Sequence, residues 1–297
     1  MLRIGIDLGG TKIEGVVIDP AGNVLERERR PTPQAEGYDA IVDSICTLVR
    51  DLERRANRAC HVGIGTPGAV STRTGALKNS NTVCLNGKPL HTDLSHELVR
   101  PIRIANDANC FALSEAVNGA GKGETVVFGV ILGTGVGGGI VVNGRLIEGL
   151  QHIAGEWGHN VLEIDGPDCY CGKRGCVETF LSGPGLARAY TESSGNPTLD
   201  ASAIVAHASN GEPAAQRVMA RYLDRFGRAL ATVINILDPN VIVLGGGMSN
   251  VDRLYTDGRD AVAGYVFNDE LRTRIVRNIH GDSSGVLGAA QLWHPDE

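Results

Sequence analysis

One local pattern occurs twice in this chain and constrains its fold more than any other feature: a strand, a glycine-rich turn and a second strand. Residues 4–18 (IGIDLGGTKIEGVVI) and residues 128–142 (FGVILGTGVGGGIVV) both have this form. Glycines allow the tight turn and β-branched residues favour the flanking strands, so each segment predicts a β-hairpin. A shift of 128 − 4 = 124 positions brings identical residues together, among them Gly5 and Gly129, Leu8 and Leu132, Gly9 and Gly133, and Gly15 and Gly139.

The repeated hairpin indicates an internally duplicated α/β protein, although glycine-rich strands can also align by chance. Each hairpin precedes alternating helical and extended patterns, which is typical of α/β folds. Helices are expected at residues 38–55, 110–117 and 212–237, and strands at residues 61–64, 101–105 and 241–244. We expect a small N-terminal lobe at residues 1–110, joined by a C-terminal helix at residues 285–297, and a larger lobe at residues 111–284.

The charge and hydropathy of the chain exclude several classes of protein. Its 28 basic and 34 acidic residues give a net charge of −6, whereas general nucleic-acid binding needs a basic surface. The apolar runs are shorter than the roughly 20 residues that cross a bilayer, so no membrane partner is expected. Asp7 interrupts the apolar residues at the N-terminus, so we expect no secretion signal and a cytoplasmic protein.

The second glycine turn contains a match to the dinucleotide-binding fingerprint. Residues 133–138 (GTGVGG) fit G-x-G-x-x-G, but that fingerprint requires a following helix, whose N-terminus holds the pyrophosphate. Here a β-branched run and a turn follow at residues 139–145, so the segment is a hairpin and not a dinucleotide site. The chain contains no G-x-x-x-x-G-K-[ST] sequence, which excludes a P-loop enzyme.

Glycine turns between strands can still bind phosphate, because they leave successive backbone N–H groups exposed as an anion site. Lys12 would add positive charge beside the first turn, and Asp7 could help to hold Mg²⁺. A glycine run after a later strand would let an adenine lie against the backbone. Any one of these loops alone could be an ordinary turn. Together they indicate ATP binding by Gly9, Gly10, Thr11 and Lys12, by Gly133, Thr134 and Gly135, and by Gly245, Gly246 and Gly247.

Three of the seven cysteines crowd into eight residues. Cys169, Cys171 and Cys176 form the sequence CYCGKRGC, which in a chain without a secretion signal indicates metal binding before disulfides. Tetrahedral zinc needs four sulfur or nitrogen ligands, and the nearest upstream histidines are His152 and His159. We therefore expect a structural zinc site with three cysteines and one histidine. Three unliganded thiols in a surface loop are the alternative.

Asp107 is the candidate general base. It lies in the sequence Asn106-Asp107-Ala108-Asn109 at an expected junction of strand and helix, where it could instead be a plain helix cap. A base there would take the proton of a hydroxyl that attacks a γ-phosphate. Further amides, carboxylates and one imidazole suit a ligand with many hydroxyls, and each of these alone could be an ordinary surface residue. They are Asn81, Asn106, Glu156, His159 and Glu178.

These motifs together resemble the ROK family of sugar kinases, within the actin-like (hexokinase/Hsp70) ATPase fold. The resemblance covers essentially the whole chain, and its most specific part is the cysteine motif with its upstream Gly-His. It implies two duplicated α/β lobes with an interlobe cleft, and it allows a homodimer, which is common in the family. The motifs that carry it are residues 7–12, 106–109, 133–137, 156–159, 169–178 and 244–248.

The resemblance also implies roles for individual residues. Asp107 would be the catalytic base, and His159 would join Cys169, Cys171 and Cys176 as zinc ligand, so that zinc shapes the sugar pocket without entering the chemistry. The sugar would lie against Asn81, Asn106, Asp107, Glu156, His159 and Glu178, with ATP and Mg²⁺ as the phosphoryl donor.

Several stretches are most similar to bacterial fructokinases of the manno(fructo)kinase type: residues 78–81, 85–89, 235–239, 248–255 and 280–285. They imply phosphorylation of D-fructose, and also of mannose, at the 6-hydroxyl. An N-acetylhexosamine kinase or a glucokinase of the same family is the alternative substrate class. A sugar-responsive repressor would need a DNA-binding domain ahead of residue 7, and a sugar-binding protein with a dead kinase site is disfavoured because the motifs are intact.

Overall fold

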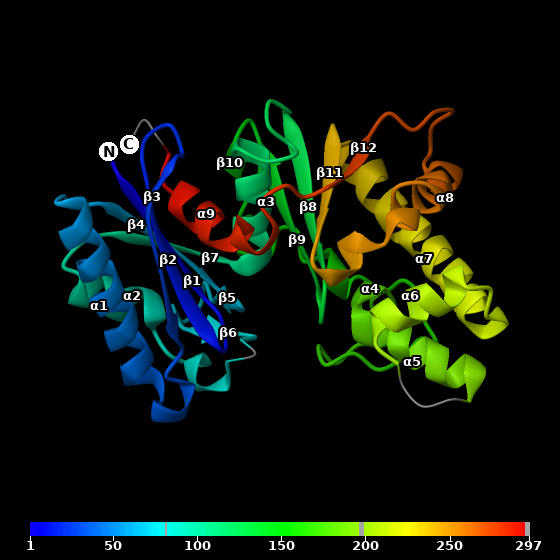
Figure 1. Ribbon diagram of the computed structural model, residues 1–297, viewed down its shortest axis with the longest axis horizontal. Coiled ribbons are helices and arrows are strands. Elements are labelled where there is room, and N and C mark those ends of the chain that lie inside the picture. Colours follow the sequence, from blue (N-terminus) through cyan, green and yellow to red (C-terminus); the bar gives the residue numbers. More distant parts are fainter. Residues whose placement is uncertain (81, 196–198, 295–297) are drawn as a thin grey trace. The chain divides into compact units, whose positions relative to one another are not determined.

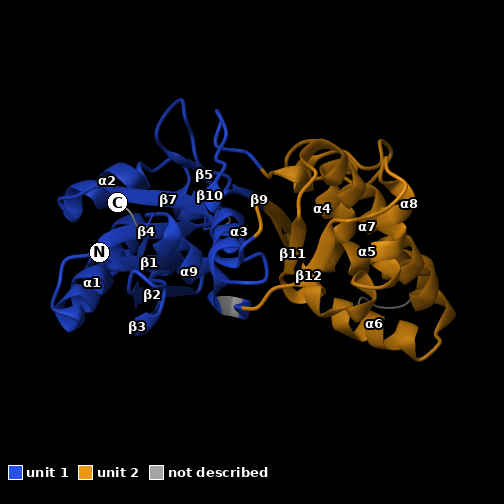
Figure 2. Cartoon of the chain, turned by 90° about the horizontal axis from the view of Figure 1, so that it is seen from above, with its two compact units in different colours: residues 1–123, 139–154, 280–297 blue, residues 124–138, 155–279 orange. Residues whose placement is uncertain are grey.

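The computed structural model describes residues 1–80, 82–195 and 199–294, and the chain divides into two compact units (Figure 2). Unit 1 consists of residues 1–123, 139–154 and 280–297, and unit 2 of residues 124–138 and 155–279. The expected lobe boundary at residue 110 falls inside helix α3 (Asp107–Val117), all of which belongs to unit 1. Unit 1 also includes the C-terminal helix α9 (Ser284–Gln291).

Unit 1 is built on a five-stranded sheet of order β3-β2-β1-β4-β7. Strand β1 pairs antiparallel with β2 from Arg3↔Ile18 to Leu8↔Ile13, which confirms the first predicted hairpin, and it pairs parallel with β4. The strands are β1 (Arg3–Leu8), β2 (Lys12–Ile18), β3 (Val24–Pro31), β4 (His61–Thr66) and β7 (Ile102–Asn106). A separate two-stranded ribbon contains β5 (Ala69–Val70) and β6 (Leu77–Lys78).

Helices cover both faces of this sheet (Figure 1). Helix α1 (Tyr38–Ala56) buries Ile41, Ile45, Leu48 and Leu52 completely, so the predicted helix at residues 38–55 is confirmed. Helix α9 lies on the opposite face, where two glycines permit a very close approach of backbones. A Cβ atom on Gly5 would lie 2.1 Å from the carbonyl oxygen of Val286, and one on Gly63 would lie 1.9 Å from that of Ala289. Helix α2 (Leu90–Glu97) completes the unit.

The second large sheet has the strand order β10-β9-β8-β11-β12. Its strands β8, β11 and β12 are parallel, as are β1, β4 and β7, while β9 and β10 pair antiparallel, as do β2 and β3. The two sheets therefore repeat one topology, which supports the internal duplication. The strands are β8 (Val126–Leu132), β9 (Val136–Val142), β10 (Arg145–Leu146), β11 (Val241–Gly245) and β12 (Arg274–Arg277).

The helices of unit 2 gather around its longest helix, α7 (Pro213–Leu237), which matches the helix predicted at residues 212–237. One face of α7 buries apolar residues, among them Tyr222, Phe226 and Leu230. Within the described part of the chain, no helix combines the length and the apolar character that crossing a membrane requires. The other helices are α4 (Val177–Leu181), α5 (Gly183–Ser194), α6 (Ala201–Ser209) and α8 (Asp257–Tyr265).

Candidate functional site

The first glycine turn joins β1 to β2 in unit 1. The N–H of Gly9 donates to the carbonyl of Lys12 at 2.9 Å and so closes the turn itself. The hydroxyl of Thr32 donates to the carbonyl of Gly9 at 2.7 Å, which fixes the turn against the end of β3. The first N–H of the turn is therefore occupied, and any phosphate would have to be bound by the residues after Gly9.

Asp7 is the next-to-last residue of β1, and two glycines lie close to its carboxylate. A Cβ atom on Gly65 would lie 3.7 Å from Oδ1 of Asp7, and one on Gly285 would lie 3.1 Å from Oδ2. Burial is the main cause that raises the pKa of Asp7 to about 6, with further contributions from the carboxylates of Asp107 and Glu14, while Lys12 lowers it. A cation beside Asp7 would relieve this repulsion, so the charge of the site fits Mg²⁺.

Glu14 is a functional candidate that the sequence analysis did not single out. Its carboxylate is fully buried and lies 3.7 Å from Nζ of Lys12, 3.3 Å from Nη1 of Arg27 and 2.9 Å from Nε of Arg29. A buried carboxylate needs such cations to offset its lost hydration. Three cations around one carboxylate hold Lys12 beside the glycine turn and leave net positive charge there. The alternation of residues along β2 and β3 is the signal that could have revealed the cluster.

Asn106 and Asp107 lie where β7 passes into α3, the junction at which Asp107 was expected to be a general base or a helix cap. The side chain of Asn106 accepts the N–H of Asn109 at 2.7 Å and is the helix cap. Asp107 is the first helical residue, and its Oδ1 accepts the N–H of Ala108 at 2.8 Å. Solvent reaches the Asp107 side chain, yet the surrounding protein removes enough hydration to raise its pKa.

A cavity of about 370 Å³ opens beside Asn106 within unit 1. Its lining includes Asn106 and Asn109 together with Gly68 and His91, whereas Asp107 is not part of it. Its volume is in the range of small-molecule sites. Asn81, which was expected in the sugar site, lies outside the described residues.

The second and third glycine loops lie together in unit 2. The N–H of Gly133 donates to the carbonyl of Gly135 at 2.9 Å, which closes this turn as Gly9 closes the first. Gly246 has a φ of 79°, and a Cβ atom there would lie 2.4 Å from the carbonyl oxygen of Leu132. Only glycine tolerates both conditions, so Gly246 packs directly beside the residue before Gly133. Gly245 ends β11, and Gly247 borders open space.

The turn from Glu156 to His159 packs against the first part of β9. Trp157 is buried and its indole N–H donates to the carbonyl of Gly137 at 3.2 Å. A Cβ atom on Gly158 would lie 2.1 Å from the carbonyl oxygen of Val136, so only glycine permits this close contact. Glu156 immediately precedes the short helix of residues 157–159. The turn thus places Glu156 and His159 beside the start of β9.

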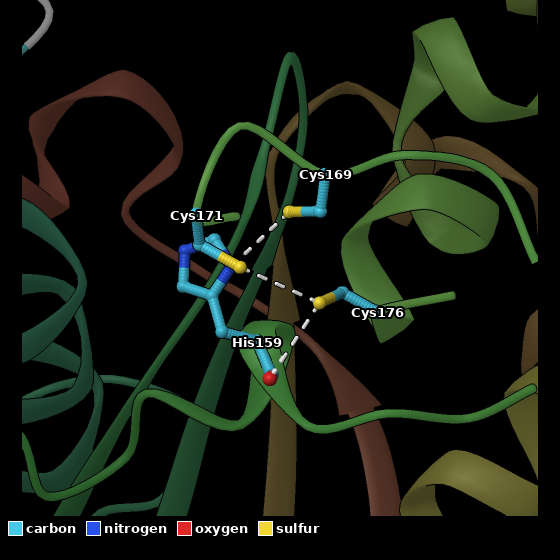
Figure 3. Close-up of side chains that lie close together, drawn as sticks. All are labelled: His159, Cys169, Cys171 and Cys176. Atoms are coloured by element: carbon cyan, nitrogen blue, oxygen red, sulfur yellow. Dashed lines mark hydrogen bonds between the residues drawn. The ribbon is translucent and has the colours of Figure 1, made fainter. Parts of the chain in front are cut away.

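Four predicted zinc ligands converge in unit 2 (Figure 3). The ligand atoms of His159, Cys169, Cys171 and Cys176 all lie within 4.8 Å of one another. Sγ of Cys169 is 3.6 Å from Nδ1 of His159, and Sγ of Cys171 is 3.6 Å from Sγ of Cys176. Zinc bonds of about 2.3 Å to sulfur and about 2.0 Å to nitrogen would place tetrahedral ligands about 3.5 to 3.8 Å apart. The donor set and its spacing fit zinc, with Nδ1 of His159 as the nitrogen ligand.

The loop that carries the thiols is anchored to α7. Glu163 forms paired contacts of 2.9 Å with Nε and Nη2 of Arg225, and it lies 2.6 Å from Nη2 of Arg228. Gly175 has a φ of 64°, and a Cβ atom there would lie 1.6 Å from the carbonyl oxygen of Glu163. These contacts place Cys176 at the start of α4.

Glu178 and Tyr170 extend the arrangement around His159. Oε2 of Glu178, in the first turn of α4, accepts the N–H of Val136 at 2.9 Å. The hydroxyl of Tyr170 lies 3.0 Å from Nε2 of His159. Burial, then the carboxylates of Glu178 and Glu156, raise the pKa of Tyr170 to about 12. The second nitrogen of His159, expected to face a sugar, thus contacts Tyr170, a residue that the sequence analysis did not single out.

Two α/β units with glycine turns and a repeated strand order define a protein of the actin-like ATPase fold. Residues 3–296 match the ROK family, and the chain belongs to that family.

Named relatives extend over nearly the whole chain. An N-acetyl-D-glucosamine kinase of Escherichia coli O127:H6 is 42% identical over 303 residues, covering 98% of this chain and 99% of the relative. The crystal structure of a ROK hexokinase from Thermus thermophilus has a TM-score of 0.91 at 32% identity and covers 100% of this chain and 99% of its own. A ROK glucokinase from Streptomyces griseus, solved with glucose and AMPPNP, has a TM-score of 0.78 at 28% identity, with coverage of 98% and 99%. These relatives do not support the expected preference for fructose.

Proposed function

We propose that this ROK-family sugar kinase phosphorylates N-acetyl-D-glucosamine, transferring the γ-phosphate of ATP to the 6-hydroxyl of the sugar. The observation that carries the proposal is the 42% identity, over 98% of the chain, with an Escherichia coli kinase of that name. The fructose expectation depended on resemblance in short stretches. The N-acetylhexosamine alternative, weighed beside it on the sequence, now has the stronger support.

Asp107 is the proposed general base. The oxygen of the 6-hydroxyl bonds to the γ-phosphorus while the bond from that phosphorus to the bridging oxygen of ADP breaks, and the hydroxyl proton passes to the Asp107 carboxylate. A raised pKa favours this role, because it makes the carboxylate a better proton acceptor than an ordinary aspartate. Its accessibility to solvent leaves the side chain reachable by a ligand.

The polar groups around the glycine turns are proposed to hold the nucleotide. Lys12, kept in place by Glu14, would neutralise phosphate charge beside the first turn. Asp7 would hold Mg²⁺, directly or through water. When bound, Mg²⁺ offsets the negative charge of the β- and γ-phosphates. Gly133, Thr134, Gly135 and the run from Gly245 to Gly247 would complete the ATP site in unit 2.

The zinc cluster is proposed to shape the sugar site without taking part in the chemistry. His159, through Nδ1, and Cys169, Cys171 and Cys176 would hold the ion, which fixes the loop and orients the outer face of the His159 ring. Glu156 and Glu178 supply acceptors for sugar hydroxyls in the same unit.

The proposal is tested by coupled ADP release from purified protein with Mg-ATP. The panel is N-acetylglucosamine, N-acetylmannosamine, glucose, mannose and fructose, each at several concentrations. We expect the highest kcat/KM with N-acetylglucosamine. A higher kcat/KM with glucose would favour the hexokinase and glucokinase relatives, and turnover confined to fructose and mannose would restore the original expectation.

A further inference from the structure

Asn109, in the first turn of α3, carries a buried amide whose bonding capacity the folded chain does not use. Its backbone N–H serves the helix cap by donating to Oδ1 of Asn106 at 2.7 Å. The side chain is only 7% exposed, and its Oδ1 is buried without a hydrogen-bond partner among the described residues. Buried polar groups are nearly always hydrogen-bonded, because an unpaired one is costly. An unpaired amide at this depth therefore indicates a ligand.

The two ends of this amide have different surroundings. A Cβ atom on Gly139, in β9, would lie 2.9 Å from Oδ1 of Asn109, so the carbonyl end packs against the backbone of that strand. Asn109 also lines the cavity of about 370 Å³ in unit 1. Since Oδ1 is the enclosed end of the amide, the N–H₂ end is the part that lines the cavity and can donate to a ligand.

The wall of this cavity joins apolar side chains to a few polar ones. Val70 and Ile104 line it, and both are partly buried against the core of unit 1. Nε2 of His91 is engaged, because it lies 3.2 Å from a backbone carbonyl of β7. Glu148 and His152 are exposed and lie 3.9 Å apart. One amide donor beside apolar side chains suits a carbonyl that carries a small apolar chain, such as an N-acyl group.

The place of this cavity beside the proposed base fits one part of a sugar. Asp107 lies in the sequence between Asn106 and Asn109, which both line the cavity, although Asp107 itself does not. A sugar whose 6-hydroxyl meets Asp107 therefore lies at the edge of the cavity. In a pyranose, C2 is directly across the ring from C5, which carries the 6-hydroxymethyl group. The 2-substituent therefore points away from the base and can enter the cavity.

We propose that this cavity receives the N-acyl group of an N-acylglucosamine and that Nδ2–H of Asn109 donates to the acyl carbonyl. This inference rests on the proposed function. It names the residue that separates an N-acylated sugar from an unsubstituted hexose. The volume of about 370 Å³ is in the range of sites for whole small molecules, so the cavity also admits acyl groups longer than acetyl.

The first test compares Asn109→Leu with the parent protein by isothermal titration calorimetry without ATP. Leucine is similar in size and lacks the donor. We expect the affinity for N-acetylglucosamine to fall roughly five- to tenfold, the usual effect of one hydrogen bond, and that for glucose to change less than about twofold. Because the amide is unpaired in the free protein, the Tm of the variant without ligand should not fall.

Ser114→Ala is the matched control. Ser114 lies on the same helix, and its Oγ is also buried without a partner among the described residues, but it does not line the cavity. Its replacement should leave both affinities unchanged.

The second test needs no variant and measures the parent protein with N-acetyl-, N-propanoyl- and N-butanoylglucosamine. We expect the three affinities to agree within about threefold. A loss of more than about tenfold from the acetyl to the butanoyl compound would show that the acyl group does not enter the cavity.

Each result of the first test also decides the question. Equal weakening for both sugars, or no weakening for either, would overturn the role of Asn109, and a lower Tm of Asn109→Leu would make the amide structural. If the parent enzyme phosphorylates N-acetylglucosamine while these tests fail, only this inference fails. If the parent enzyme does not phosphorylate it, the proposed function fails.

Discussion

Oε2 of Glu178 accepts a hydrogen bond of 2.9 Å from the backbone N–H of Val136, the residue that follows the second glycine turn. This bond joins a candidate sugar ligand on α4 to a candidate phosphate loop on β9. A change in the conformation of the turn should therefore also displace the Glu178 side chain in the candidate sugar site of unit 2.

Gly135→Ala tests this connection. The new Cβ atom would lie 2.6 Å from Oε2 of Glu178, so the carboxylate must move away from Val136. We expect the KM for sugar to rise roughly tenfold, the cost of about one charge-assisted hydrogen bond. Gly264→Ala is the control, since a Cβ atom there meets nothing within 4 Å. A change confined to the KM for ATP would show that Glu178 does not transmit the effect.

Asp107→Asn should remove the proposed general base while the protein still binds the sugar. We expect kcat to fall by about 10²- to 10⁴-fold, the usual contribution of a general base, while the dissociation constant of the sugar from calorimetry changes less than about threefold. Asp43→Asn, an exposed carboxylate on α1, should leave kcat unchanged. A variant of Asp107 that keeps more than half of the parent kcat would remove this residue from the mechanism.

Cys176→Ser should abolish metal binding. The parent protein should contain one zinc ion per chain by elemental analysis, and the variant less than about a tenth of that, because a hydroxyl replaces a buried thiolate ligand. The KM for sugar should rise more than the KM for ATP. Cys84→Ser, outside the cluster, should keep its zinc. A parent protein without zinc would contradict the assignment of this site.

Asp7→Asn should stabilise the protein when nucleotide and Mg²⁺ are absent. Burial and nearby carboxylates raise the pKa of Asp7 to about 6. The ionised carboxylate therefore destabilises the folded protein at neutral pH. This destabilisation disappears as the pH falls toward the ordinary pKa of aspartate. If the pKa of this group is about 3.9 in the unfolded chain, the raised pKa lowers the free energy of unfolding by about 3 kcal/mol at pH 7.5 and by about 1 kcal/mol at pH 4.5.

Urea unfolding of both proteins at the two pH values measures the difference. The gain in the free energy of unfolding from Asp7→Asn should shrink by about 2 kcal/mol between pH 7.5 and pH 4.5. The same variant should bind Mg-ATP more weakly. If the gain in the free energy of unfolding is the same at both pH values, the charge of the Asp7 carboxylate is not its cause.

The sequence predicted the features that depend on local pattern. The first hairpin, the long helices and the cluster of three cysteines follow from spacing, because strand alternation, helical periodicity and thiol clusters are short-range signals. Spacing left His152 and His159 both open as the fourth ligand, and the family resemblance favoured His159. The contact of Tyr170 with His159 depends on how a loop folds back, and no spacing encodes it. The burial of Glu14 among Lys12, Arg27 and Arg29 likewise depends on the pairing of β2 with β3.

Local sequence patterns do not determine the extent of the two units or the choice of substrate, for a physical reason. Residues 139–154 belong to unit 1 although they follow a strand of unit 2, and only tertiary contacts decide this. Substrate preference depends on a few polar atoms around one sugar substituent, whereas phosphate-binding turns and a general base suit phosphoryl transfer to any hydroxyl.

A competition assay tests the central claim most directly. Purified enzyme with limiting Mg-ATP receives equal concentrations of N-acetylglucosamine and fructose, and ³¹P and ¹H NMR identify and quantify the phosphorylated products. The product ratio equals the ratio of the two kcat/KM values. The account predicts that N-acetylglucosamine 6-phosphate predominates by about tenfold or more, which corresponds to a difference of about 1.4 kcal/mol in transition-state binding. A predominance of fructose 6-phosphate would contradict it.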